Sequence, residues 1–187
     1  MTDAEPHHLR VLVADERQLY LEPVTDAVEA LGHRVVSHEV DIAAVGPATV
    51  EHRPDVAIVA LHEDTQHALD LITEIVEEAT CPVIALADAA SREFVAEAAD
   101  RGVFAYLDST RETELQGGID VALQRYREHE KLLAAFKRRA RIERAKGMLM
   151  VRHGEDDRAA FERMRQEARR TRRPLIEIVD EVLDGGG

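Results

Sequence analysis

Short apolar runs alternate with stretches of helical period through the first half of the chain. The apolar runs span residues 9–14, 35–36, 56–61, 83–87 and 103–107. A continuous run such as 56–61 is typical of a strand that is covered on both faces. The stretches between the runs repeat their apolar residues at three- and four-residue spacing, which favours helices. Strands that alternate with helices predict an α/β domain with a five-stranded, parallel, doubly wound sheet.

The pattern changes after about residue 112. Residues 112–153 contain no proline and predict one long helix, on which Ile119, Leu123, Tyr126 and Leu133 fall near a coiled-coil spacing. We interpret it as a helix whose first part packs on the sheet and whose later part extends away from the sheet. Its row of apolar residues, the seam, would then pair with the same helix of a second copy. The alternative is an amphipathic helix that packs back on the sheet. Gly154 is expected to end it, and two short helices follow, the second with Pro174 at its first position.

The charge is divided unevenly along the chain. The formal net charge is −13, yet residues 137–187 carry 14 Lys and Arg against 10 Asp and Glu, whereas residues 1–136 carry 10 against 27. The last third is therefore the part suited to a polyanion, although a helical surface must be charged in any case. The absence of Trp and the few aromatic residues argue against base stacking of the kind used by sheet-type RNA readers.

Several function classes find no support in the residues. No Gly-rich phosphate loop follows the first strand, and the nine histidines show no metal-ligand grouping. We find no nucleophile–base pair, so we expect no enzyme, no metal and no cofactor. The single cysteine, Cys81, is expected at the edge of the core. No signal peptide and no bilayer-spanning run is visible, so a soluble, cytoplasmic protein without a membrane partner is expected.

Residues at the carboxyl ends of the strands are the first candidate site, because ligands of doubly wound sheets bind there. They are Asp15, Glu16, Ala60, Ala87 and Ser109. Around them the chain resembles the flavodoxin-like receiver domain of bacterial response regulators over about residues 9–127. Asp15 and Glu16 stand where receivers keep an acidic pair for Mg²⁺, and residues 102–107 match the Gly-Ala-x-x-Tyr-Leu run of that family.

The departures from the receiver pattern affect its chemistry. Ala60 lies at the end of the third strand, where the family keeps its phosphoacceptor aspartate. Ala87 replaces the switch Thr or Ser, and Ser109 with Thr110 replaces Lys-Pro. An alanine methyl cannot attack a phosphoryl group, and the Mg²⁺ site lacks one carboxylate. We therefore predict a pseudo-receiver that is not phosphorylated at the usual position; Asp64 and Asp88 lie near the same rim, most simply as solvated charges.

The C-terminal residues resemble the ANTAR domain of transcription antitermination regulators. The matching segments are residues 142–150, 153–154, 160–161 and 168–175. The resemblance implies a three-helix bundle that binds a pair of adjacent RNA hairpins. The expected RNA-binding residues are Arg144, Lys146, Gly147, Arg169, Arg170, Arg172 and Arg173. Cations there reach phosphates, and a glycine lets RNA approach the helix closely; alternatively, Arg144 pairs with a nearby acid.

The sequence thus predicts four segments: a tail at 1–8, a pseudo-receiver at 9–118, a coiled-coil linker at 119–138 and an ANTAR domain at 139–184. The function we expect is RNA-binding transcription antitermination through tandem stem-loops. The expected partners are RNA, a second copy bound through 119–138, and a sensor or regulator protein on the receiver. The alternative is a dimeric protein-interaction module of a signalling pathway that binds no RNA.

Overall fold

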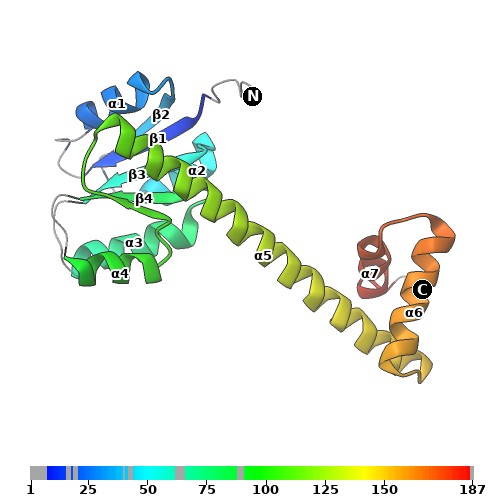
Figure 1. Cartoon of the computed structure of the whole chain (residues 1–187). Coiled ribbons are helices and arrows are strands. Elements are labelled where there is room, and N and C mark those ends of the chain that lie inside the picture. Colours follow the sequence, from blue (N-terminus) through cyan, green and yellow to red (C-terminus); the bar gives the residue numbers. More distant parts are fainter. Residues whose placement is uncertain are drawn as a thin grey trace. The chain divides into compact units, whose positions relative to one another are not determined.

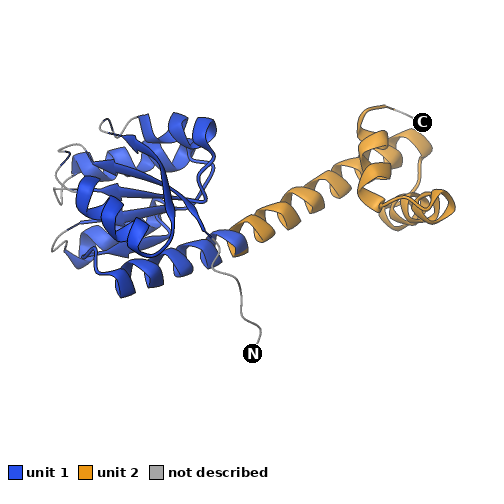
Figure 2. Cartoon of the chain, turned by 90° about the horizontal axis from the view of Figure 1, so that it is seen from above, with its two compact units in different colours: residues 1–127 blue, residues 128–187 orange. Residues whose placement is uncertain are grey.

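The computed structural model describes residues 8–15, 18, 21–39, 41, 44–61, 66–87 and 91–185. The chain divides into two compact units, residues 1–127 and 128–187 (Figure 2). Glu16, Asp64 and Asp88 of the predicted site and rim lie outside the described residues. No described helix combines the length and the apolar character needed to cross a membrane.

The first unit is built on the predicted parallel sheet. Its strands are β1 (Arg10–Asp15), β2 (Arg34–Glu39), β3 (Val56–Ala60), β4 (Val83–Leu86) and β5 (Ala105–Leu107). They lie in the order β2-β1-β3-β4-β5, and every neighbouring pair is parallel. All of β3 and β4 is buried, as continuous apolar runs predict. The five-stranded, doubly wound architecture is therefore confirmed.

Helices cover both faces of this sheet (Figure 1). They are α1 (Leu21–Ala30), α2 (Val45–His52), α3 (Gln66–Glu78), α4 (Arg92–Asp100) and the first part of α5 (Glu112–His153). Val11 and Val13 of β1 pack with α1 and α5, whereas Leu12 and Ala14 pack with α2, α3 and α4. This alternation follows from the two-residue period of a strand, which sends successive side chains to opposite faces.

Local signals set several helix ends in this unit. The Ser91 hydroxyl accepts a hydrogen bond from the backbone N–H of Phe94 at 3.1 Å, which caps α4. Gly102 follows that helix with a φ of +101°, a conformation that side chains with a Cβ rarely adopt. Cys81 lies in the core itself, and its burial raises the pKa of the thiol to about 12. The thiolate is therefore not available near neutral pH.

The start of α5 docks on the sheet. Leu115, Ile119 and Ala122 are fully buried, and the Tyr126 hydroxyl donates to the Thr80 carbonyl oxygen at 3.1 Å. A Cβ on Gly118 would lie 2.6 Å from the Leu107 side chain, so glycine lets the helix lie close to β5. The first unit extends to residue 127, beyond the boundary predicted at residue 118, because this part of the helix belongs to the core.

The second unit contains the rest of α5 with α6 (Asp157–Thr171) and α7 (Leu175–Leu183). Its core consists of one face of each helix: Ala145, Leu149, Ala160, Met164, Ile178, Val179 and Val182. Gly154 follows α5 with a φ of +63°, and Asp156 caps α6 by accepting from the Ala159 N–H at 2.8 Å. Pro174 precedes the first residue of α7 and occupies its N-cap position, one residue earlier than predicted.

Candidate nucleic-acid interface

Lys146 lies within the bundle, although its charge suggests a surface residue. Only 8% of the residue is exposed, and its Nζ lies 2.5 Å from Asp157 Oδ1 and 2.8 Å from Glu143 Oε2. The hydrogen bonds from Asp157 and then from Glu143 raise the pKa of Lys146. Because Asp157 is the first residue of α6, this pairing ties the start of α6 to α5. Two of the three N–H donors of the ammonium group are thus directed at carboxylates of the chain itself.

Two other predicted cations also have acidic partners. Arg170 donates to Glu167, with nitrogen–oxygen distances of 2.5 and 2.9 Å. This bond raises the pKa of Arg170 and lowers the pKa of Glu167. Arg173 donates to Glu177 at 2.8 Å and to Glu181, which connects the end of α6 to α7. These pairs are partly exposed, where water and salt screen them, so their partners can be exchanged at low energetic cost.

Three of the predicted cations have no such partner. Arg144, Arg169 and Arg172 are exposed and form no ion pair with any residue of the described ranges. Arg172 follows the last turn of α6 in the left-handed conformation, with a φ of 55°. Guanidinium groups without internal partners are the ones best able to bind phosphate oxygens, because no existing bond has to break.

Gly147 lies on an exposed part of α5. A Cβ built on it would meet nothing within 4 Å, which agrees with the expectation of open space beside this residue. Arg144, Gly147, Met148, Val151 and Arg152 line a shallow hollow of about 500 Å³ on this surface. Met148 also contacts the bundle core, so the hollow lies over a packed and well-supported part of the helix.

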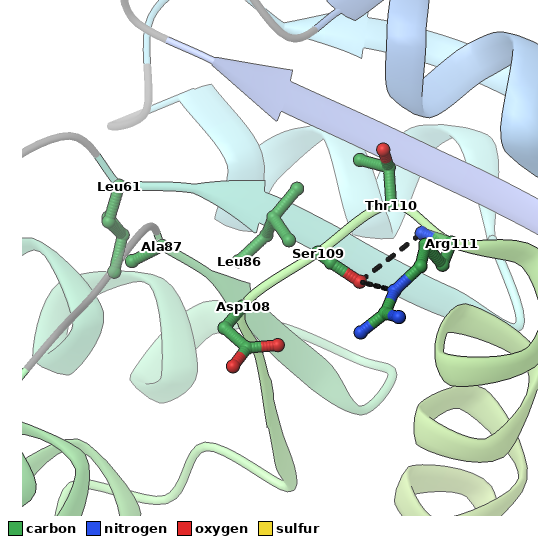
Figure 3. Close-up of a pocket in the computed structure, with 7 residues that line it drawn as sticks. All are labelled: Leu61, Leu86, Ala87, Asp108, Ser109, Thr110 and Arg111. Carbon is green, nitrogen blue, oxygen red and sulfur yellow. Dashed lines mark hydrogen bonds between the residues drawn. The ribbon is translucent and has the colours of Figure 1, made fainter.

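The carboxyl ends of the strands form a second candidate site, in the first unit. Asp15 and Ala60 end β1 and β3, lie side by side in the sheet register and are both buried. Ala87 is also buried, and the Ser109 hydroxyl is hydrogen-bonded to Glu114. Close by, a pocket of about 230 Å³ opens over the sheet edge (Figure 3). Its lining consists of Leu61, Leu86, Ala87, Asp108, Ser109, Thr110 and Arg111.

This pocket combines an apolar wall with a polar rim. Arg111 points its guanidinium toward Ser109, with Nε 3.4 Å from the hydroxyl oxygen (Figure 3), and also binds Glu114. The described residues hold no group of three His, Cys, Asp or Glu side chains that is arranged to bind a metal ion. Asp15, one of the two receiver carboxylates expected from the sequence, lies at the end of β1 beside Ala60 and is not among the residues that line this pocket.

Comparison with known families decides what the second unit is. Residues 130–183 match the ANTAR domain family. The chain carries an ANTAR domain. This match includes the end of α5 and all of α6 and α7, and it contains every residue that we predicted to bind RNA.

Two characterised relatives extend the similarity. The chain is 28% identical over 185 residues to the transcriptional regulatory protein PdtaR of Mycobacterium tuberculosis, a match that covers 93% of this chain and 90% of PdtaR. The aliphatic amidase regulator of Pseudomonas aeruginosa is 41% identical over 54 residues, which are 29% of this chain and 28% of that protein. The similarity to PdtaR therefore spans both units of this chain.

Solved structures identify the fold of the first unit. The signal receiver domain of NarL from Mycobacterium tuberculosis superposes with a TM-score of 0.53 at 24% identity, over 62% of this chain and 96% of that one. A receiver domain of a diguanylate cyclase from Desulfovibrio desulfuricans gives a TM-score of 0.55 at 17% identity, over 65% and 98% of the two chains. The first unit thus has the receiver fold.

Some cations near the ANTAR domain surface were not singled out from the sequence. Lys137, Arg138, Arg139 and Arg158 are exposed and form no ion pair with described residues. Arg152 lines the hollow beside Gly147. The signal that could have found Arg152 is its place one turn after Met148 on the same helix, since residues four apart are neighbours on a helix surface.

Proposed function

We propose that the protein is an antitermination regulator that binds tandem RNA hairpins through its ANTAR domain. The observation that carries this proposal is the match of residues 130–183 to that family, together with the exposed arginines on the matched helices. A nascent transcript as the target means that the protein acts in the cytoplasm. Stabilising two hairpins would prevent the overlapping terminator structure from forming.

The exposed arginines would make the direct phosphate contacts. Arg144, Arg169 and Arg172 have no internal ion pair to break, so they are the first residues to reach the RNA backbone. Arg170 and Arg173 would follow by exchanging a carboxylate for a phosphate. Lys146 would act mainly by holding α6 in place, because its ammonium group is enclosed between Asp157 and Glu143.

Two copies of the chain would present two ANTAR domains to two hairpins. Leu132 and Phe136 on α5 support a seam between copies, since they are 72% and 71% exposed although both are large and apolar. They fall within the predicted linker at residues 119–138, after the part of α5 that packs on the sheet. Pairing of these helices would bury both side chains.

The receiver-like unit would control the ANTAR domain without the usual aspartyl phosphorylation. Ala60 and Ala87 support this proposal because both are buried where the receiver chemistry needs a carboxylate and a hydroxyl. The unit would then receive its signal from a sensor or regulator protein. Incubation with a small phosphodonor should leave the intact mass unchanged, whereas a stable gain of one phosphoryl group would contradict the proposal.

The experiment that tests RNA binding uses the full chain and a pool of two-hairpin RNAs with randomised loops. We expect a subset of the pool to be retained and to bind more tightly than single hairpins cut from the same RNAs. Transcription of a template that carries a selected element before a terminator should read through more often when the protein is present. A chain that retains no RNA at low salt would instead favour the protein-interaction module.

A further inference from the structure

The pocket at the carboxyl ends of β3, β4 and β5 has an apolar floor. The floor consists of Leu61, Leu86 and Ala87, each of them at most 8% exposed. Its backbone takes part in the sheet: the Leu61 N–H donates to the Leu86 carbonyl oxygen at 2.8 Å, and the Ala87 N–H donates to the Leu107 carbonyl oxygen at 3.0 Å. The floor therefore presents mainly aliphatic carbon to a ligand.

The opposite wall carries charges of both signs. It consists of residues 108–111, which connect β5 to α5 (Figure 3). Asp108 is exposed and forms no hydrogen bond or ion pair with any other described residue. Arg111 pairs with Glu114, but its side chain is 74% exposed and a guanidinium has five N–H donors, so donors remain for a ligand. An anion and a cation thus stand along the edge of an apolar floor.

The pocket lies where the chain departs from the receiver pattern. Ala87 and Ser109 line it, and both side chains are smaller than the hydroxyl residue and the lysine that receivers keep at these positions. The Tyr106 hydroxyl donates to the Ala87 carbonyl oxygen, and the Ser109 hydroxyl donates to Glu114. A smaller side chain leaves a cavity when its surroundings do not collapse around it. The substitutions that remove the phosphotransfer groups therefore also open this space.

The size and the lining restrict the class of ligand. Pockets for drug-sized molecules typically measure about 300–1,000 Å³, so a pocket of about 230 Å³ is too small for a nucleotide. Inorganic phosphate would set its oxygen atoms against the side chains of Leu61 and Leu86, which donate no hydrogen bonds. A compact aliphatic molecule with charged groups at one end fits both walls.

We propose that this pocket binds a small aliphatic α-amino acid of about the size of leucine. The aliphatic side chain would lie on the floor, its carboxylate would bind Arg111, and its ammonium group would bind Asp108. Hydrogen bonds between ionised groups are stronger than those between neutral ones, so both ends of the wall would contribute. A simple carboxylic acid would leave Asp108 without a partner. The proposal concerns the receiver-like unit alone and does not depend on RNA binding.

The ligand would act on the start of α5. The Arg111 carbonyl oxygen accepts hydrogen bonds from the N–H groups of Glu114 at 3.0 Å and Leu115 at 2.8 Å, which form the first turn of that helix. Leu115 is fully buried in the core of the same unit. A ligand that holds Arg111 would therefore steady the first turn of α5. This would give the receiver-like unit a chemical signal in addition to a partner protein.

Isothermal titration calorimetry of the full chain with L-leucine tests the proposal. We expect a dissociation constant of about 1 mM or lower. Two analogues each lack one charged group: 4-methylpentanoate has no ammonium group, and 3-methylbutylamine has no carboxylate. Each analogue should bind at least about tenfold more weakly than L-leucine, because each loses one charge-assisted hydrogen bond to the wall.

Two variants assign the charged contacts separately. Arg111→Gln should weaken L-leucine binding at least about tenfold and leave the affinity for 3-methylbutylamine unchanged. Asp108→Asn should weaken L-leucine binding similarly and leave the affinity for 4-methylpentanoate unchanged. Arg101→Gln is the matched control, because Arg101 is a paired arginine of the same unit that does not line the pocket. Since residues 108 and 111 are exposed, the melting temperature should stay within about 3 °C of the wild type.

Hydrogen exchange gives a second measurement. With L-leucine at about ten times its dissociation constant, amides in the first turn of α5 should exchange about tenfold more slowly, and amides of α2 should not change.

Three results would overturn the proposal. They are the absence of both heat and protection at about 10 mM L-leucine, wild-type affinity for L-leucine in both Arg111→Gln and Asp108→Asn, and binding of 4-methylpentanoate as tight as that of L-leucine. The last would mean that Asp108 takes no part and that the ligand is not an amino acid. None of these results would affect the proposed RNA binding, which is measured separately.

Discussion

At the sheet edge of the receiver-like unit, two alanines, Ala60 and Ala87, are buried where phosphorylation chemistry would need oxygen atoms. On the ANTAR domain, by contrast, Arg144, Arg169 and Arg172 keep their charges exposed and without internal partners. A receiver fold depends on its apolar strands, so the first unit keeps this architecture with alanine at both positions. An electrostatic interface differs in this respect, because the charged side chains on its surface are the groups that bind the ligand.

We expect the two units to be stable independently of each other. Met164 is 1% exposed in the ANTAR core, so Met164→Ala should lower the unfolding free energy of that unit by about 2–5 kcal/mol. Tyr20, Tyr106 and Tyr126 all lie before residue 128, so tyrosine fluorescence follows the first unit while circular dichroism follows both. The urea transition seen by tyrosine should not move. A parallel shift of both signals would mean that the units unfold together.

The second prediction restores a carboxylate to the receiver-like unit. Ala60 lies beside the buried Asp15 in the sheet, so Ala60→Asp would place two carboxylates about 5 Å apart in a site closed to water. The unfolding free energy of that unit should fall by about 1–3 kcal/mol and should recover in part with Mg²⁺, which binds carboxylate oxygens. Urea melts with and without Mg²⁺ measure both effects.

Ala60→Asn is the matched control for this change, because it has nearly the same size and no charge. It should destabilise the unit and show no response to Mg²⁺. If Ala60→Asp proves as stable as the wild type without the metal, the region around Asp15 is more open to water than its burial indicates.

Some parts of this fold can be predicted from the sequence more readily than others. The parallel sheet was predictable because continuous apolar runs such as 56–61 have few alternatives, and the helix stop at Gly154 was predictable from its position after the last apolar turn. Docking of Ile119 was less evident, since an apolar residue at coiled-coil spacing fits a sheet or a partner helix equally well. The close approach of Gly118 to Leu107, which the structure shows, identifies the sheet as the partner of this part of the helix.

The ion pairs of the candidate interface are harder to predict from the sequence. The sequence places Lys146 among the basic residues of a helix, but it does not show that Glu143 and Asp157 enclose the ammonium group. Glu143 is three residues away and therefore a foreseeable neighbour. Asp157 reaches Lys146 only because the chain turns at Gly154, so this contact depends on the tertiary fold. Whether an arginine forms an ion pair with another described residue, as Arg170 does and Arg144 does not, likewise depends on rotamers that a sequence does not give.

The third prediction concerns the seam between copies. If two copies pair through α5 as proposed, Phe136→Glu should raise the dissociation constant of that homodimer at least about tenfold, because each copy loses an apolar contact and gains a charge. Analytical ultracentrifugation of the full chain measures it. Val50→Glu is the control, since Val50 is also exposed, at 57%, but lies on α2. Equal effects of the two changes would remove the basis for a seam on α5.

The smallest effect expected is a dependence of ANTAR stability on pH. The Arg170 hydrogen bond holds the pKa of Glu167 below its ordinary value of 4.5, so the pair stabilises the fold above that pH. This contribution should be lost as the pH falls through the lowered pKa, and Glu167→Gln should abolish it. Thermal melts of both proteins across the acid range should converge at low pH. Curves that stay parallel would show that the pair adds nothing to stability.

If exposed arginines without ion pairs deliver RNA binding, these arginines should set the salt dependence of the affinity for RNA. For the selected two-hairpin RNA, the slope of log affinity against log salt should become less steep by about 2–3 in the Arg144→Gln, Arg169→Gln, Arg172→Gln triple variant. The Lys146→Met variant should keep the wild-type slope, because that ammonium group serves the contact between α5 and α6. A wild-type slope in the triple variant, or a slope reduced by Lys146→Met alone, would contradict the account.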